Sequence, residues 1–100
     1  MGKFTLTDEA KEDMKEVKAH SLTQWGATVT KAYLQGMRVT MQMLADHPLG
    51  IDISSETWPG VCYWPYESHY LYFLRAPEGI QVIAVIHHAP LPKAVKKRQP

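Results

Sequence analysis

Histidine, tyrosine and one cysteine are among the side chains of this 100-residue chain whose types could support catalysis or metal binding. His87 and His88 are adjacent, so on an extended strand they point to opposite faces and do not readily chelate one ion. Cys62 has no neighbouring base that would lower the pKa of its thiol. The chain has no CxxC or HExxH spacing and no glycine-rich phosphate loop. These patterns predict no metal site and no cofactor.

Cleavage of RNA without a metal requires cations beside the scissile phosphate and side chains that move protons. His69 and His87, together with nearby tyrosines, could move protons. No Lys or Arg occurs between Arg38 and Arg75, however, so the predicted sheet has little positive charge with which to hold a phosphate. This distribution argues against a nuclease and leaves it open as an alternative.

Two runs rich in aromatic and β-branched residues must position these side chains. Ser68–Arg75 and Gly79–His87 suit a pleated, packed surface, and the segment Ala76–Gly79 between them has turn chemistry. They predict an antiparallel hairpin. Every residue from Val82 to Ile86 is apolar, so this second strand should lie centrally in the sheet with cover on both faces.

Helical periodicity marks the first half of the chain. Thr7 is a suitable N-cap, and the apolar spacing after it predicts a helix that ends near Gln24, with Gly26 as the breaker. A second helix is predicted from about Ala27 to Asp46. The short link between them makes the two helices antiparallel neighbours.

Three further segments complete the predicted fold. Lys3–Leu6 is a short extended segment and Leu49–Thr57 is a loop. Val61–Tyr66 is a strand that Pro65 confines to a sheet edge or a bulge, because proline cannot donate to a ladder. The fold class is therefore α+β: an N-terminal antiparallel helical hairpin packed on a three- or four-stranded antiparallel β-sheet. Residues 1–100 form one domain, with a basic tail from about residue 89.

Charge, apolar runs and cysteine count argue against several classes of protein. The net charge of +1 gives no overall nucleic-acid signature, and the longest apolar run is about five residues, far short of the ~20 that a membrane helix needs. The N-terminus lacks the apolar region of a signal peptide. A single cysteine points to a reducing compartment. We therefore expect a cytoplasmic protein with no membrane contact and no direct DNA binding.

Two surface features remain open to two interpretations each. Six aromatic residues crowd the middle of the chain, and they either form a protein interface or cover the second face of the sheet. The last eight residues carry four of the eleven Lys and Arg residues. This tail is either a solvated end or a site for an acidic partner or nucleic acid. The six aromatic residues are Trp58, Tyr63, Trp64, Tyr66, Tyr70 and Tyr72.

The order of these elements resembles the RelE/ParE superfamily of bacterial toxin–antitoxin toxins, and most closely its ParE branch. The resemblance extends from about Phe4 to His88. Trp25-Gly26 is similar to the Trp-Gly of the family's helical turn, and Ile80–His87 is similar to its last strand, which ends in histidine. Further matching residues are Leu6-Thr7, Ala10, Asp13-Met14, Val17, Tyr33, Leu44-Ala45, Pro48, His69 and Tyr72-Phe73.

The resemblance implies a small toxin that a short antitoxin, encoded beside it, neutralises. ParE-like members typically inhibit DNA gyrase without catalysis, whereas RelE-like members cut messenger RNA on the ribosome. Cys62 and Ala84 stand where the family often has arginine, which agrees with the argument against RNA cleavage. The same departure keeps open a degenerate toxin that retains only antitoxin binding.

On this basis we expect a non-catalytic toxin with gyrase as its target. The predicted target-binding residues are Arg75, His87, His88, Lys93, Lys96 and Lys97. The predicted antitoxin-binding residues, if the apolar stripe of the second helix is wider than the sheet needs, are Trp25, Tyr33, Met37 and Met41. In the alternative of a RelE-type messenger RNA endonuclease, His69 and His87 would do acid–base work while Arg75 and the tail hold phosphate.

Overall fold

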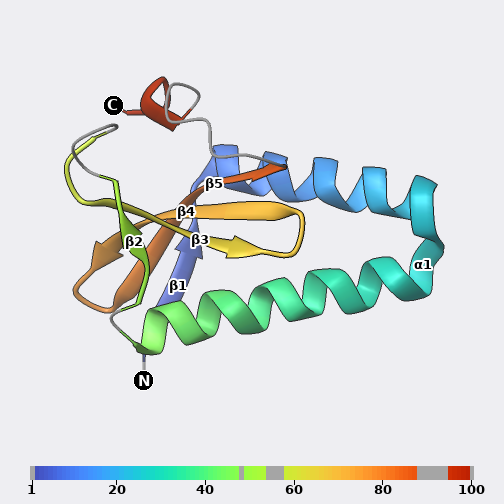
Figure 1. Cartoon of the computed structure of the whole chain (residues 1–100), viewed down its shortest axis with the longest axis horizontal. Coiled ribbons are helices and arrows are strands. Elements are labelled where there is room, and N and C mark those ends of the chain that lie inside the picture. Colours follow the sequence, from blue (N-terminus) through green and yellow to red (C-terminus); the bar gives the residue numbers. More distant parts are fainter. Residues whose placement is uncertain (1, 48, 54–57, 88–94, 100) are drawn as a thin grey trace.

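A helical hairpin packs against one β-sheet in the computed structural model, which describes residues 2–47, 49–53, 58–87 and 95–99 (Figure 1). The predicted α+β class is confirmed. The elements, in chain order, are β1 (Lys3–Leu6), α1 (Asp8–Asp46), β2 (Ile51–Asp52), β3 (Val61–Tyr66), β4 (His69–Ala76) and β5 (Gly79–His87).

The helix begins at the predicted cap, where the backbone N–H of Ala10 donates to Oγ1 of Thr7 at 3.1 Å. Helical residues continue to Asp46 on both sides of Gly26, so the count of labelled elements differs from the prediction: the two predicted helices are the two arms of the single element α1. Gly26 nevertheless interrupts the helix with φ 83° and ψ 178°, a backbone conformation that glycine adopts without strain. The chain reverses there, and the first arm (residues 8–25) and second arm (residues 27–46) run antiparallel (Figure 1).

Two buried hydroxyls join the arms close to this reversal. The hydroxyl of Thr30 lies 2.8 Å from that of Ser21 and also donates to the carbonyl of Gly26 at 2.7 Å. Both side chains are at least nine-tenths buried. Because buried polar groups need partners, these contacts fix how the hairpin closes.

The sheet has five strands in the order β1-β5-β4-β3-β2. The predicted hairpin is confirmed: β4 and β5 pair antiparallel, and Ala76 opposite Gly79 leaves a two-residue turn. β1 pairs with β5 in parallel, however, so the prediction of a purely antiparallel sheet of three or four strands is wrong. No local turn joins β1 to β5, and their relative direction depends on how α1 carries the chain across the sheet.

The fifth strand lies in the segment predicted as a loop. Ile51 and Asp52 form β2 opposite Tyr63 and Cys62, while residues 54–57 of that segment lie outside the described part. Two residues are too few for a strand period to be recognised in a sequence. β2 pairs only with Cys62 and Tyr63 of β3, so the rest of β3 is a sheet edge. Pro65 lies on this edge, as predicted.

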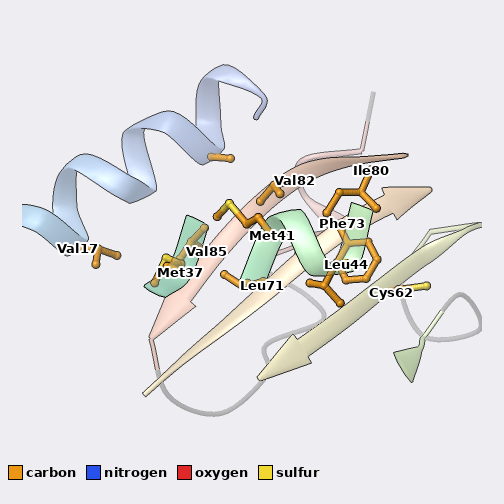
Figure 2. Packing of buried hydrophobic residues seen from close by; sticks show 11 residues of the cluster. Val17, Met37, Met41, Leu44, Cys62, Leu71, Phe73, Ile80, Val82 and Val85 are labelled. Atoms are coloured by element: carbon orange, nitrogen blue, oxygen red, sulfur yellow. The ribbon is translucent and has the colours of Figure 1, made fainter. Parts of the chain in front are cut away.

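The main core lies between the hairpin and the sheet (Figure 2). Met37, Met41 and Leu44 of the second arm pack against Leu71 and Phe73 of β4, and each is at most 1% exposed. Burial of each such side chain contributes about 1.5–3 kcal/mol. Met37 and Met41 of the second arm are therefore core residues.

The opposite face of the sheet is also covered, as the apolar run of β5 predicts. A bulge beside Tyr72 makes Ile83 an extra residue, so that Ile83 and Ala84 both pack in the second cluster while Val82 and Val85 pack in the first. The second cluster contains Trp58, Val61, Tyr72, Ile83, Ala84 and Val95, with Tyr63 and Tyr70 against it. Four of the six central aromatics therefore cover this face, and Trp64 and Tyr66 pack on the other.

The C-terminal turn, residues 95–99, attaches to β5 beyond the end of β1. Asp13 of the first arm accepts two hydrogen bonds from the guanidinium of Arg98, at 2.6 and 3.0 Å, and one from the backbone N–H of Val85 at 2.9 Å. Arg98 also donates to the carbonyl of Ile83 at 2.9 Å. The Asp13–Arg98 pair therefore supplies hydrogen-bond partners for the N–H of Val85 and the carbonyl of Ile83, which β1 does not reach. The hydrogen bond from Arg98 to Asp13 is the main reason why the pKa of Arg98 is raised.

Candidate functional site

Three histidines from distant parts of the chain gather where β4 begins and β5 ends. The ring centroids of His69 and His87 are 4.8 Å apart, and those of His20 and His87 are 6.0 Å apart. They line two adjoining cavities of about 380 and 250 Å³, and Trp25 and Tyr33 line the larger one. We call this site the histidine pocket.

Tyr33 orients the most buried histidine of the pocket. Its hydroxyl oxygen lies 2.6 Å from Nδ1 of His69, and it also forms a hydrogen bond with the backbone of Ser68. The tautomer of His69 decides which of the two side chains donates, because both the phenol and the imidazole nitrogen can do so. Burial raises the pKa of Tyr33, so the phenol remains neutral.

The charges around the pocket do not suit a phosphate. Asp13 and Glu16 line the smaller cavity, and no Lys or Arg is among the described residues that line either cavity. A scissile phosphate needs cations or oriented N–H donors as its negative charge increases. His69 and His87 are close enough to exchange protons through a bound group, but none of the described residues that line the pocket is a Lys or Arg that would hold the phosphate in place.

Arg75 and His87, two of the predicted target-binding residues, lie at opposite ends of the hairpin. Arg75 lies at the turn end of β4 and His87 at the opposite end of the hairpin, about 20 Å away by strand length. The Arg75 guanidinium donates to the carbonyls of His47, at 3.4 Å, and Leu49, and it lies over the ring of Phe73. Arg75 therefore holds the segment that follows α1 against the sheet.

The remaining predicted target residues belong to the chain's C-terminal part. Lys96 and Lys97 are exposed on the C-terminal turn, beside the Asp13–Arg98 pair. His88 and Lys93 lie outside the described residues. The tail is therefore not simply a solvated end, because Val95 is fully buried and Arg98 is bound to the first arm.

The predicted antitoxin-binding residues divide into two groups. Trp25 is 68% exposed beside the reversal at Gly26, and Tyr33 lines the histidine pocket. Met37 and Met41 are 0% and 1% exposed, so in this fold they offer no surface to a partner. The stripe is no wider than the sheet requires at these two positions, and the prediction is retained for Trp25 and Tyr33.

Cys62 and Ala84, which stand where the resemblance leads us to expect arginine, are both packed in this chain. Cys62 is 8% exposed in the main core, and Ala84 is 0% exposed in the second cluster. Neither side chain therefore offers a surface to a target. Their small volume suits the packing around them, and long charged side chains would need a different arrangement of both clusters.

Cys62 should behave as an unreactive thiol. Desolvation by burial raises its pKa, and the nearby carboxylate of Asp52 acts in the same direction. At neutral pH we expect a thiol-reactive dye to label the native chain at least roughly tenfold more slowly than the unfolded chain, because the thiolate is the reacting form. Equal labelling rates, measured by absorbance of the released dye, would contradict this assignment.

Two searches of the described part of the chain bear on other classes of function. No three His, Cys, Asp or Glu side chains in it are placed so that they could share a metal ion. No helix among the described residues has the length and apolarity needed to cross a membrane.

Two residues at these sites are not among those predicted from the sequence. His20 occurs on the polar side of the first arm, and its only sequence signal is that it follows the core residue Val17 by one helical turn. Arg98 pairs with Asp13 across 85 residues of chain. No spacing rule connects positions so far apart.

Comparison with known proteins gives consistent matches along nearly the whole chain. Residues 4–92 match a family model described as the ParE toxin of the type II toxin–antitoxin system parDE. Toxin ParE of Escherichia coli is 28% identical over 88 residues, which cover 87% of this chain and 85% of that protein. Toxin ParE1 of Caulobacter vibrioides is 24% identical over 89 residues, covering 89% of this chain and 92% of that protein.

A solved structure shares the fold. A chain of the chromosomal ParDE toxin–antitoxin system from P. aeruginosa superposes with a TM-score of 0.73 at 20% identity, and the match covers 89% of this chain and 98% of that chain. The hairpin and sheet described above are therefore an arrangement already known in another protein.

Proposed function

The chain belongs to the ParE toxin family of type II toxin–antitoxin systems, and from this we propose that it arrests bacterial growth by binding DNA gyrase without catalysing a reaction. The observation that carries the proposal is the family match over residues 4–92. The histidine pocket agrees with a binding role, since carboxylates rather than cations line its walls. We propose that the chain encounters both gyrase and a neutralising antitoxin in the cytoplasm.

The proposed mechanism is occupancy by a folded surface. The main core and the second cluster pack on the two faces of the sheet and hold the strands in one arrangement. The Asp13–Arg98 pair holds the C-terminal turn against them. Because such a surface is already ordered, it can dock on a larger enzyme without a large loss of conformational entropy. The predicted contacts with the target remain His87, His88, Lys93, Lys96 and Lys97, whereas Arg75 already binds carbonyls of its own chain.

Induction of this chain alone in a bacterial culture tests the proposal. Growth should stop, plasmids extracted from the arrested cells should have altered supercoiling, and mapped transcripts should be intact. Normal growth with soluble, folded protein would overturn the proposal in favour of a degenerate toxin that only binds its antitoxin.

Cleavage of messenger RNA is a second candidate because of one observation. The rings of His69 and His87 lie 4.8 Å apart, which is a suitable separation for a pair that donates and accepts protons on one substrate. Transcripts cut within codons soon after induction, with plasmid supercoiling unchanged, would favour this candidate over gyrase binding.

A cognate antitoxin is the second proposed partner, and the hairpin tip is the proposed contact. Three large apolar side chains are exposed around the reversal at Gly26: Leu22 at 41%, Trp25 at 68% and Val29 at 49%. Exposed apolar side chains that lie together are typical of a surface that a partner covers. The aromatic ring of Trp25 is the largest of them.

Replacing Trp25 with alanine should weaken binding of the antitoxin encoded beside the gene by roughly 10- to 30-fold, because interface tryptophans commonly dominate binding energy. The fold should be unaffected, since this side chain is 68% exposed. Val39→Ala is the matched control, because Val39 is also an exposed apolar residue of α1, at 65%, and lies away from the tip. Unchanged affinity in calorimetry of folded Trp25→Ala would contradict the assignment.

A further inference from the structure

The histidine pocket has the size of a small-molecule site, and the proposed function gives it no ligand. Its larger cavity, of about 380 Å³, lies within the range of about 300–1,000 Å³ that is typical of such sites. Val17, His20, His69 and His87 line both this cavity and the smaller one of about 250 Å³. The two cavities therefore share a wall and form one cleft.

Rings and apolar side chains form much of the wall of the larger cavity. The rings of Tyr33 and His69 meet edge to face, with their centroids 5.6 Å apart. Trp25 lines the same cavity, and Val17 and Val29 add apolar surface to it. The faces of aromatic rings carry partial negative charge and attract cations, most strongly for tryptophan and tyrosine. This wall therefore favours an organic ligand that is both apolar and positively charged.

The first arm of α1 presents negative charge to the pocket. Asp13 and Glu16 are three residues apart, which places them on one face of the helix, and both line the smaller cavity. The lysines of the same arm line other cavities: Lys11, Lys15 and Lys18. The charges of this arm are therefore divided between its faces, and the acidic face is the one beside the pocket.

One guanidinium reduces this negative charge without cancelling it. Arg98 is bound to Asp13 at 2.6 Å and lies 3.8 Å from Glu9. Its pKa is raised chiefly by the hydrogen bond to Asp13, and the charges of Glu9 and Glu16 act in the same direction. Three carboxylates thus act on one guanidinium, so negative charge remains in excess. Glu16 is exposed at the smaller cavity, where it can contact a ligand.

Another carboxylate lies beside the larger cavity. Glu67 and Ser68 connect β3 to β4, and Ser68 lines this cavity. Burial is the main cause that raises the pKa of Tyr33, and the charge of Glu67 acts in the same direction, which places that carboxylate near the Tyr33 ring. Glu67 is exposed. Each cavity therefore has an accessible carboxylate beside it, and the shared wall lies where the cavities join.

From this arrangement we infer that the histidine pocket binds a linear aliphatic polyamine. One ammonium group donates to Glu16 in the smaller cavity, and a second lies near Glu67, over the ring of Tyr33. The methylene chain between them crosses the shared wall. A purely apolar ligand would leave the carboxylates without a partner, and an anion would be repelled by them. The inference goes beyond the proposed function, because this site requires neither gyrase nor an antitoxin.

Three five-carbon ligands of equal chain length test the chemistry. Cadaverine carries an ammonium group at each end, pentanediol a hydroxyl and glutarate a carboxylate. In calorimetry of the full chain, cadaverine should bind with a Kd below about 1 mM, and the other two should not bind measurably. Added salt should weaken the binding of cadaverine. Equal binding of cadaverine and pentanediol would overturn the inference, as would tighter binding of glutarate or no binding of cadaverine.

Removal of the two carboxylates tests the location. Glu16→Gln combined with Glu67→Gln should weaken cadaverine binding at least roughly tenfold, because each substitution removes a charged acceptor. Both side chains are exposed, so the fold should be unaffected. The matched control is Glu12→Gln with Glu78→Gln, which removes the same charge at exposed positions outside the pocket and should cost less than about threefold. Equal losses in the two double variants would overturn the location.

Two tryptophans give an independent readout of the location. Trp25 lines the pocket, whereas Trp58 packs in the second cluster on the other face of the sheet. In NMR spectra of the full chain, addition of cadaverine should shift the indole N–H signal of Trp25 and leave that of Trp58 in place. A shift of the Trp58 signal alone would overturn the location.

A lysine side chain of another protein is the other source of an ammonium group. A short acetylated peptide of alternating lysine and alanine distinguishes the two sources. If it displaces cadaverine at lower concentrations than spermidine does, the occupant is a protein segment and the inference is wrong. None of these measurements uses growth or gyrase. A chain that binds cadaverine but does not arrest growth contradicts only the proposed toxin activity, and the reverse result contradicts only the polyamine site.

Discussion

Gly79→Ala should detach β1 from the sheet and lower the free energy of unfolding by about 4 kcal/mol, through backbone strain and overpacking together. Gly79 has φ of 153°, and a Cβ atom built there would lie 2.0 Å from the carbonyl oxygen of Lys3. The obstacle is backbone of the parallel partner strand, which cannot move aside as a flexible side chain can. Denaturant unfolding followed by tryptophan fluorescence measures the loss.

Gly26→Ala is the control for this substitution. Gly26 also has a positive φ, of 83°, but no atom lies within 4 Å of the added Cβ. With ψ of 178° it lies in a backbone region that is essentially restricted to glycine, so the substitution should cost only that strain, of order 1–3 kcal/mol. A Gly79→Ala loss no larger than the Gly26→Ala loss would contradict the close approach of β1 to β5.

Asp13→Ala should lower the free energy of unfolding by about 3 kcal/mol, because the change removes one partner of a largely buried ion pair. The side chains of Arg98 and Asp13 are 21% and 13% exposed. The substitution leaves the guanidinium with only the longer contact to the more exposed Glu9, at 3.8 Å, and the N–H of Val85 without its acceptor. For a chain of this length, such a loss corresponds to a fall in Tm of roughly 12–24 °C.

Glu12→Gln provides the comparison for Asp13→Ala. It removes the ion pair with Lys15 on the same arm, but those side chains are 68% and 74% exposed, so the expected cost is below about 0.5 kcal/mol. A double-mutant cycle with Arg98→Met separates the pair from other effects of each substitution. A coupling energy near zero would show that the C-terminal turn does not depend on this pair.

Sequence reasoning located the elements whose signals are local. The β4–β5 hairpin follows from its turn residues, and the cap at Thr7 and the break at Gly26 follow from short-range backbone chemistry. Helical periodicity also marks the second arm as amphipathic, although it did not distinguish the buried Met37 and Met41 from a surface for a partner. In each of these cases the partners lie close in the chain or the pattern repeats within one element.

The errors concern contacts between distant residues. The parallel pairing of β1 with β5 and the two-residue strand β2 depend on how the whole chain packs, and no local pattern encodes either one. The same holds for the candidate sites. His69 and His87 are paired by strand register, but the addition of His20 and Tyr33 to them depends on where the hairpin lies on the sheet.

Inhibition of purified DNA gyrase can be measured as the supercoiling of relaxed plasmid with and without this chain. We expect the folded chain to inhibit supercoiling in proportion to its concentration and the cognate antitoxin to restore it. Full gyrase activity at a large excess of folded chain would contradict gyrase binding as the function, and cleavage of messenger RNA by the same preparation would favour the nuclease instead.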